Sequence, residues 1–354
     1  MPHLDPTRPV HVVQLTDAHL FADPAGTMLG LNTRDSLRHV VAQVRREQPC
    51  IDLLLCTGDL SQDASVASYE AFRELTGAFG VATRWLPGNH DEARVMAEIA
   101  QGTDLVQAVT DLGGWRIVML DSAVLGATHG LLEEAQLSIL EHALKTAGER
   151  HCLVCLHHQP VDIGCAWIAP IGLRNAQALF AIVERYPQVR ALLWGHVHQE
   201  WDEVREGRRL LATPSTCIQF AARSEDFKVS EEHPGYRWLR LHADGRQQPA
   251  ESAGRARAVF DAGAVSRGLR GHAVVAVLVE GEIPLVVEPG AKRCGILPFR
   301  IAGIEPAHGL LTRNVPGMVH RLALRTCDGS ALLHRNRALN ADVGHCGCDQ
   351  GNHH

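Results

Sequence analysis

Residues 51–59 read IDLLLCTGD, an apolar run that ends in a glycine and an aspartate. A short, continuous apolar run bounded by a turn residue is typical of a strand that is buried on both faces of a sheet. Glycine permits a tight turn at the end of such a strand, and the next side chain then lies at the edge of the sheet. Ligands of α/β proteins bind at that edge. The stretch therefore predicts a buried strand over 51–57 with Asp59 at a ligand-binding edge.

The same pattern extends in both directions along the chain. Further buried strands are predicted over residues 10–16, 83–86, 115–120, 152–156 and 189–194. Stretches with helical spacing of apolar residues lie between them, over residues 33–47, 65–78, 133–146 and 173–185. This alternation indicates an α/β fold. Shorter runs predict antiparallel strands that complete a second sheet, over residues 198–204, 208–212, 217–220 and 236–241.

The composition argues against several classes of protein. Hydrophobic residues make up 45% of the 354 residues and the formal net charge is −6, which suits a folded protein that does not bind nucleic acid non-specifically. No run approaches the roughly 18 apolar residues of a membrane span, and the first ten residues lack an apolar signal core. We therefore expect a cytoplasmic protein with no membrane partner, and its ten cysteines are expected to be reduced.

Four more of the predicted strands end in side chains of the kind that bind metals. These motifs are Asp17-Ala18-His19, Gly88-Asn89-His90-Asp91, His157-His158 and Gly195-His196-Val197-His198. In an extended chain residues two apart point the same way, so the Asp-x-His and His-x-His pairs can each bind one ion together. The Gly-Asn-His-Asp motif is the most specific, because a neutral oxygen stands next to a histidine that can transfer a proton. Each motif alone is weak, but together they predict a metal centre.

These motifs, in this order, resemble those of the calcineurin-like metallophosphoesterase superfamily. A closer likeness is to the bacterial class III 3′,5′-cyclic-AMP phosphodiesterases and covers about the first 245 residues. The segments that carry it are TDAHLF at 16–21, GDLSQD at 58–63, residues 164–199, LATPSTC at 211–217 and PGYRW at 234–238. Two departures, Ala18 and Gln159, are not expected metal ligands and bear at most on substrate fit.

The resemblance implies an α/β fold of two packed mixed β-sheets flanked by helices, a four-layer sandwich. It also implies two divalent ions, one bound by Asp17, His19 and His198 and the other by Asn89, His157 and His196, with Asp59 bridging them. His157 is preferred over His158 because it directly ends the apolar run. Nitrogen and oxygen donors suit Fe²⁺ or Mn²⁺, with Zn²⁺ as a further candidate, better than Mg²⁺ or Ca²⁺. The side chains expected to bind substrate are those of His19, Asp59, Asn89, His90, His158 and His198.

The expected reaction is hydrolysis of 3′,5′-cyclic AMP to 5′-AMP by a hydroxide that the two metals activate. His90 is expected to donate a proton to the departing oxygen, and Asp63 to orient His90. One alternative is a phosphodiesterase of glycerophosphodiesters or other small phosphodiesters, since the metal motifs fit any of these. Another is a metal-binding regulatory protein without turnover, against which the intact Asn89-His90 pair argues.

A change of character after residue 245 predicts two domains. Residues 1–245 form the expected catalytic domain, and 246–354 form a poorly structured C-terminal extension. Such a tail, rich in Arg, Gly and Ala, is what a frameshift in a high-GC gene would produce. The competing interpretation is a small accessory domain, supported by strand-like runs at 273–279 and 283–287.

Overall fold

The computed structural model describes residues 8–245, 247–249, 277–279, 282–285, 310–315 and 318–323. The chain divides into two compact units, Met1–Arg270 and Gly271–His354. Most of the predicted extension 246–354 lies outside the described residues, so its character and the boundary at 245 stay predictions. No helix in the described part of the chain is both long and apolar enough to cross a bilayer.

The first sheet has five strands in the order β13-β12-β1-β4-β5. They are β1 (Val10–Leu15), β4 (Leu53–Thr57), β5 (Ala82–Leu86), β12 (Arg237–Leu241) and β13 (Gln247–Pro249). The central strands β1, β4 and β5 run parallel, whereas β12 is antiparallel to β1 and β13 is antiparallel to β12. The carboxyl ends of the three parallel strands therefore share one edge of the sheet.

The second sheet has six strands in the order β10-β11-β9-β8-β7-β6. They are β6 (Val109–Leu112), β7 (Trp115–Met119), β8 (His151–Cys155), β9 (Val189–Trp194), β10 (Trp201–Arg205) and β11 (Arg208–Ala212). The four inner strands β7, β8, β9 and β11 are parallel, and antiparallel β6 and β10 close the two edges. A parallel block thus places the ends of β8 and β9 side by side.

The two sheets pack face to face because their strands are apolar on both faces. On β1, Val10 and Val12 belong to a buried cluster shared with Ile117 and Leu193 of the second sheet. Val13 of the same strand belongs instead to a cluster formed with helices. This alternation follows from the two-residue period of a strand. A continuous apolar run therefore buries both sides of each sheet, as the sequence predicted.

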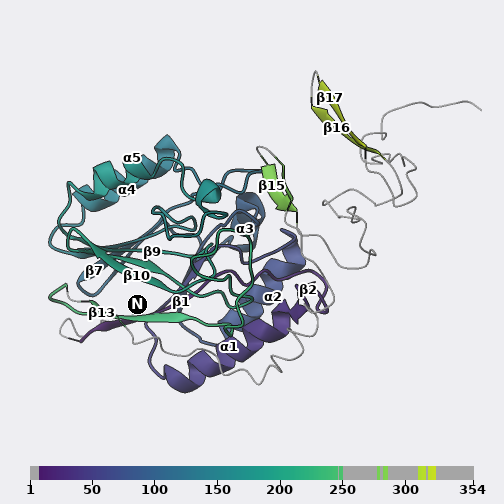
Figure 1. Ribbon diagram of the computed structural model, residues 1–354. Helices are drawn as coiled ribbons and strands as arrows, with labels where there is room; N and C mark the ends of the chain where they lie inside the picture. The colour runs from purple at the N-terminus through teal and green to yellow at the C-terminus, as the bar shows by residue number, and fades with distance from the viewer. Residues whose placement is uncertain are drawn as a thin grey trace, which may run out of the picture. The chain divides into compact units, whose positions relative to one another are not determined.

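Helices cover the two outer faces and complete four layers (Figure 1). The helices α1 (Thr33–Glu47), α2 (Val66–Gly77) and α3 (Ala93–Ile99) pack on the first sheet. The helices α4 (Glu134–Lys145) and α5 (Ala176–Val183) pack on the second. Asn32 caps α1 by accepting a hydrogen bond from the Asp35 backbone N–H at 2.8 Å, and Ser65 caps α2 in the same way. The predicted four-layer α/β sandwich is confirmed.

Four details differ from the sequence prediction. β11 is antiparallel to β10 in the second sheet, as predicted, but it runs parallel to its other neighbour β9. β12 joins the first sheet rather than the second. Residues 217–220 form a loop, whose one strand-like contact is an isolated bridge between Phe220 and Val229. The first sheet also continues beyond Leu241 into β13. An apolar run shows that a strand is buried but not which strand lies beside it, because the connecting loops decide its neighbour and direction.

Short elements complete the described chain. A two-residue pair, β2 (Thr27–Met28) and β3 (Leu31–Asn32), precedes α1, and a 3₁₀ turn covers Ala169–Ile171. In the C-terminal unit β14 (Val277–Val279) pairs antiparallel with β15 (Glu282–Leu285), where the sequence predicted two strand-like runs. A further antiparallel pair joins β16 (Leu310–Val315) and β17 (Met318–Ala323).

Candidate metal centre

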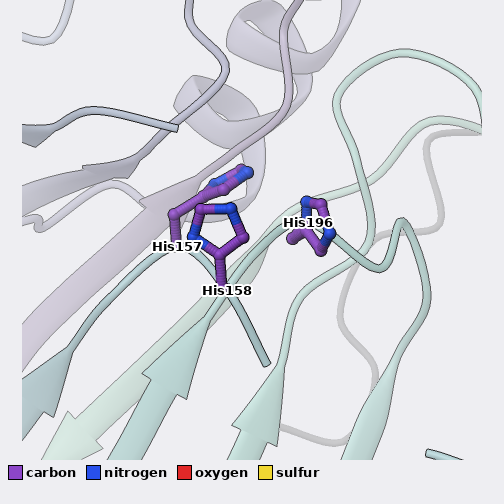
Figure 2. Close-up of side chains that lie close together, drawn as sticks. All are labelled: His157, His158 and His196. Atoms are coloured by element: carbon purple, nitrogen blue, oxygen red, sulfur yellow. The ribbon is translucent and has the colours of Figure 1, made fainter. Parts of the chain in front are cut away.

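The segments that follow β1, β4, β5, β8 and β9 bring the predicted metal-binding side chains together. Several groups of three have ligand atoms within 4.8 Å of one another: Asp17, His19 and His198; Asp17, Asp59 and His157; His19, Asp59 and His90; and His157, His158 and His196. Figure 2 shows the last group, in which the three imidazoles lie close together at the ends of neighbouring strands. Asp17 and His198, which are 181 positions apart in sequence (198 − 17), thus lie in one cluster.

The backbone turns sharply at the candidate ligands. Asp17, His19, Asp59, His196 and His198 have φ angles of 55°, 48°, 50°, 66° and 44°. The expectation that the Asp-x-His and His-x-His pairs lie on extended strands is therefore wrong. Both strands end before the motifs, and alternating left-handed residues bring the two side chains together instead. Left-handed backbone costs a non-glycine residue about 1–2 kcal/mol, so the surrounding contacts must hold these residues in place.

Two glycines of the motifs are required by close approach. A Cβ on Gly58, whose φ is +92°, would lie 2.3 Å from Nδ1 of His157. A Cβ on Gly88 would lie 2.2 Å from Oδ1 of Asp59. Both distances are far shorter than any real contact of a Cβ atom, so each glycine makes room for a candidate ligand. This explains why a glycine precedes the polar residue in both motifs.

Backbone carbonyls orient two of the imidazoles. Nδ1 of His157 donates to the Thr57 carbonyl oxygen at 2.8 Å. Nδ1 of His198 donates in the same way to Ile218, also at 2.8 Å. A carbonyl oxygen only accepts, so Nδ1 carries a proton and Nε2 is the ring nitrogen left to bind a metal. Such a second hydrogen bond is the usual partner of a metal-binding histidine.

Polar side chains orient two more imidazoles. Nδ1 of His19 lies 2.7 Å from Oε1 of Gln62, and Nδ1 of His158 lies 2.8 Å from Oγ of Ser122. In both cases Nε2 again faces away from the orienting group. No role was predicted for either residue: Gln62 lies within the segment 58–63 but is not a metal ligand there, and Ser122 lies in none of the motifs.

Four buried polar atoms without a hydrogen-bond partner belong to the motifs that follow β5, β8 and β9. They are Oδ1 of Asn89 and the Nε2 atoms of His157, His158 and His196. Leaving such an atom unsatisfied costs about 1–3 kcal/mol, and a cation between these lone pairs would satisfy them. The donor set therefore fits divalent metal ions. It does not separate His157 from His158, since both present a free Nε2, although Nε2 of His157 lies 3.3 Å from Oδ2 of Asp59.

The charges of the cluster also favour bound cations. Burial raises the pKa of Asp59, but the neighbouring His157 and His90 more than offset it and hold that pKa well below its usual range. Burial lowers the pKa of His157 as well, yet the Asp59 carboxylate brings it up to about 9. The position of Nε2 of His157 thus attracts positive charge. Burial lowers the pKa of His19 to about 3, so this imidazole is neutral and offers a lone pair.

His90 stands at the open side of the cluster. Its side chain is partly exposed, and its ring centroid lies 4.9 Å from that of His19. Its backbone N–H donates to Oδ1 of Asp59 at 2.9 Å, which ties it to the ligands. This location suits a group that exchanges a proton with a substrate.

Asp63 has a different environment from the one expected. Its Oδ2 accepts from the Ala22 backbone N–H at 2.8 Å, and its Oδ1 accepts from the Ser65 hydroxyl at 2.7 Å and the Ser61 hydroxyl at 3.2 Å. Within the described part of the chain, none of its hydrogen bonds reaches His90. These contacts hold the loop before α2 rather than orient the proton donor.

Asp91 has a structural role that the sequence analysis missed. Its carboxylate accepts backbone hydrogen bonds from Gly88 at 2.9 Å, Ser61 at 3.0 Å and Leu60 at 3.2 Å. It therefore fastens the loop after β5 to the loop after β4. Asp91 is the last residue of the Gly-Asn-His-Asp motif, so its position was visible in the sequence. An aspartate in such a motif is more readily interpreted as a metal ligand or a turn residue than as a group that joins two loops.

Comparison with known proteins identifies this arrangement. Residues 10–200 match the sequence model of the calcineurin-like phosphoesterases. The chain belongs to this family. Members of the family use a dinuclear metal site, and the clustered His and Asp residues supply candidate ligands for it.

Two curated relatives are similar over most of their length. The chain is 54% identical over 237 residues to the 3′,5′-cyclic adenosine monophosphate phosphodiesterase CpdA of Pseudomonas aeruginosa, which covers 67% of this chain and 87% of the relative. It is 45% identical over 238 residues to the protein of the same name in Escherichia coli (strain K12), and the match covers 67% of this chain and 86% of that relative. A solved dimetal phosphatase from Danio rerio shares the fold, with a TM-score of 0.50, 18% identity and coverage of 67% of this chain and 94% of that chain.

Proposed function

We propose that this chain hydrolyses 3′,5′-cyclic AMP to 5′-AMP at a dinuclear metal centre. The observation that carries the proposal is the convergence of buried, unpartnered donor atoms at the ends of β5, β8 and β9. The substrate is inferred from the relatives above, which are named for this activity and are 54% and 45% identical to the chain over the aligned residues. A cytoplasmic location is part of the proposal and is tested by cell fractionation.

The geometry supports a particular division of the ligands. One ion would be held by Asp17, His19 and His198, and the other by Asn89, His157 and His196. Oδ2 of Asp59 lies 3.3 Å from Nε2 of His157 and 3.7 Å from Nε2 of His19. This carboxylate is thus within reach of one ligand from each set, as a bridging residue must be. Nitrogen and oxygen donors favour Fe²⁺ or Mn²⁺, and also accommodate Zn²⁺.

The ions, when bound, activate water and neutralise charge on the phosphoryl group. The phosphodiester would lie against the side chains of His19, Asp59, Asn89, His90, His158 and His198. Hydrolysis to 5′-AMP breaks the bond from phosphorus to the 3′ oxygen, and the departing oxygen needs a proton. His90 is placed to supply it, because its ring is partly exposed and lies beside His19.

A substrate panel tests the proposal. Protein purified without chelator should contain two transition-metal ions per chain and convert cyclic AMP to 5′-AMP. A glycerophosphodiester assayed in parallel should turn over more slowly. Faster turnover of the glycerophosphodiester would assign a different substrate to the same centre. Metal-loaded protein that hydrolyses neither would indicate a metal-binding protein without turnover.

A further inference from the structure

Residues 215–220 form a loop, called here the 215–220 loop, that contacts the backbone next to one candidate ligand. Oγ of Ser215 donates to the carbonyl oxygen of Asp17 at 2.7 Å and accepts from the Cys217 backbone N–H at 2.8 Å. The Thr216 backbone N–H donates to the carbonyl oxygen of Thr16 at 3.0 Å. One end of the loop therefore holds the left-handed turn at Asp17.

The other end of the 215–220 loop holds a second candidate ligand, His198. The Ile218 carbonyl accepts from Nδ1 of His198, and the Phe220 backbone N–H donates to the His198 carbonyl oxygen at 3.1 Å. The Phe220 ring stacks on the imidazole, with centroids 4.2 Å apart and planes 9° apart. The imidazole is thus fixed both at one nitrogen and over one face.

Gln219 joins the two ends of the loop. Its side chain is 3% exposed, and its Oε1 accepts from the Ser215 backbone N–H at 3.0 Å. Its Nε2 donates to the Ser215 carbonyl oxygen at 2.7 Å. Oγ of Ser36 on α1 donates to the carbonyl oxygen of Thr216 at 2.6 Å. The loop is therefore a closed, anchored unit and not a loosely packed connection.

We propose that the 215–220 loop positions Asp17 and His198 and so sets the affinity of one of the two ions selectively. This rests on the proposed function, which gives those two residues to the same ion. The histidine proposed for the other ion, His157, is oriented by Thr57. Within the described part of the chain, no hydrogen bond joins the 215–220 loop to His157 or His196, and the link between the two sets is the Asp17 carboxylate, which accepts from the His196 backbone N–H at 3.1 Å. Phe220 is a positioning residue that acts on the ion through His198.

Phe220→Leu tests the proposal, because it removes the flat ring and keeps an apolar side chain at a partly exposed position. The matched control is Phe227→Leu. The Phe227 ring packs at 5.4 Å from Phe220 and 5.1 Å from Trp167, so it belongs to the same aromatic group but not to the stack on His198. Phe220→Tyr restores a flat ring and serves as the rescue.

The readout is the dissociation constant of each Mn²⁺ ion, measured by competition with a chromophoric chelator. Loss of an orienting partner lowers metal affinity by about 10- to 100-fold. We expect a loss of this size for one ion in Phe220→Leu, with the other ion unchanged and with wild-type affinities in Phe220→Tyr and Phe227→Leu. Ser215→Ala, which acts through Asp17, should weaken the same single ion and provides a second, independent variant.

The outcomes separate this inference from the proposed function. A wild-type chain that binds fewer than two ions overturns both. Two ions in the wild type, together with unchanged affinities in Phe220→Leu and Ser215→Ala, overturn only the role of the loop. Equal losses for both ions, or the same loss in Phe227→Leu, would also overturn it, because they would reflect general packing.

Discussion

Gly58→Ala should lower the rate of hydrolysis about 10²-fold while leaving the protein folded. The new Cβ would lie 2.3 Å from Nδ1 of His157, whereas ordinary contacts begin at 3.4 Å. The imidazole must therefore move by about 1 Å, and a displacement of this size costs about 10²-fold in rate, or about 2.7 kcal/mol. The movement also breaks the hydrogen bond from His157 to Thr57, worth about 1 kcal/mol. The left-handed φ of Gly58 adds a penalty of about 1–2 kcal/mol to folding.

Gly80→Ala is the matched control. Gly80 also has a positive φ, +65°, but no atom lies within 4 Å of a Cβ placed there. This variant should lose about 1 kcal/mol of unfolding free energy and keep full turnover and both ions. Urea unfolding, elemental analysis and kcat for cyclic AMP give the three measurements. The reasoning is refuted if Gly58→Ala stays within twofold of the wild type, or if Gly80→Ala loses as much activity.

Four further changes test separate parts of the site. His90→Ala should retain two ions by elemental analysis while kcat falls about 10²- to 10⁴-fold; near wild-type turnover at neutral pH would remove it as the proton donor. Asp59→Ala should impair binding of both ions, and two ions per chain in that variant would disprove the bridge. Asp63→Ala should lower the unfolding free energy by about 1 kcal/mol because its hydrogen bonds are lost, and kcat should stay unchanged. A large drop in kcat would instead support Asp63 as the residue that orients His90. Truncation after Gly245 should preserve metal content and activity. Its melting temperature should be lower than that of a chain truncated after Pro249, which keeps β13. Insoluble or inactive protein from both truncations would place the remaining tail in the catalytic domain.

The buried strands and the clustered donors could be predicted because each leaves a local signal. The predicted helix over 33–47 matches α1 residue for residue, since the apolar spacing that predicts it lies within the segment. The motifs at 57–59 and 87–91 end strands that are parallel neighbours, and parallel strands end at a common edge. The parallel pairing of these strands thus brings the two predicted motifs together.

What could not be predicted depends on partners that are distant in sequence. Ser122 and His158 are 36 residues apart, and Ile218 is 20 residues from the imidazole it orients. The spacing of apolar residues along the sequence does not indicate which distant residues form such pairs. The left-handed backbone at Asp17 and His19 was also missed, because a short polar motif after a strand is compatible with both an extended and a turned conformation. Tertiary contacts decide between the two.

The proposed ligands come from both sheets. Asp17, Asp59 and Asn89 follow strands of the first sheet, while His157 and His196 follow strands of the second. Two bridged metal ions bound between these residues would act as a cross-link between the two sheets at one end of the sandwich. At a free metal concentration of 100 times the dissociation constant, one such ion contributes about 2.7 kcal/mol to stability. Metal supply would then govern the lifetime of the folded protein as well as its catalytic rate. Removal of the metal by a chelator should increase hydrogen exchange first at the strand ends nearest the metal centre.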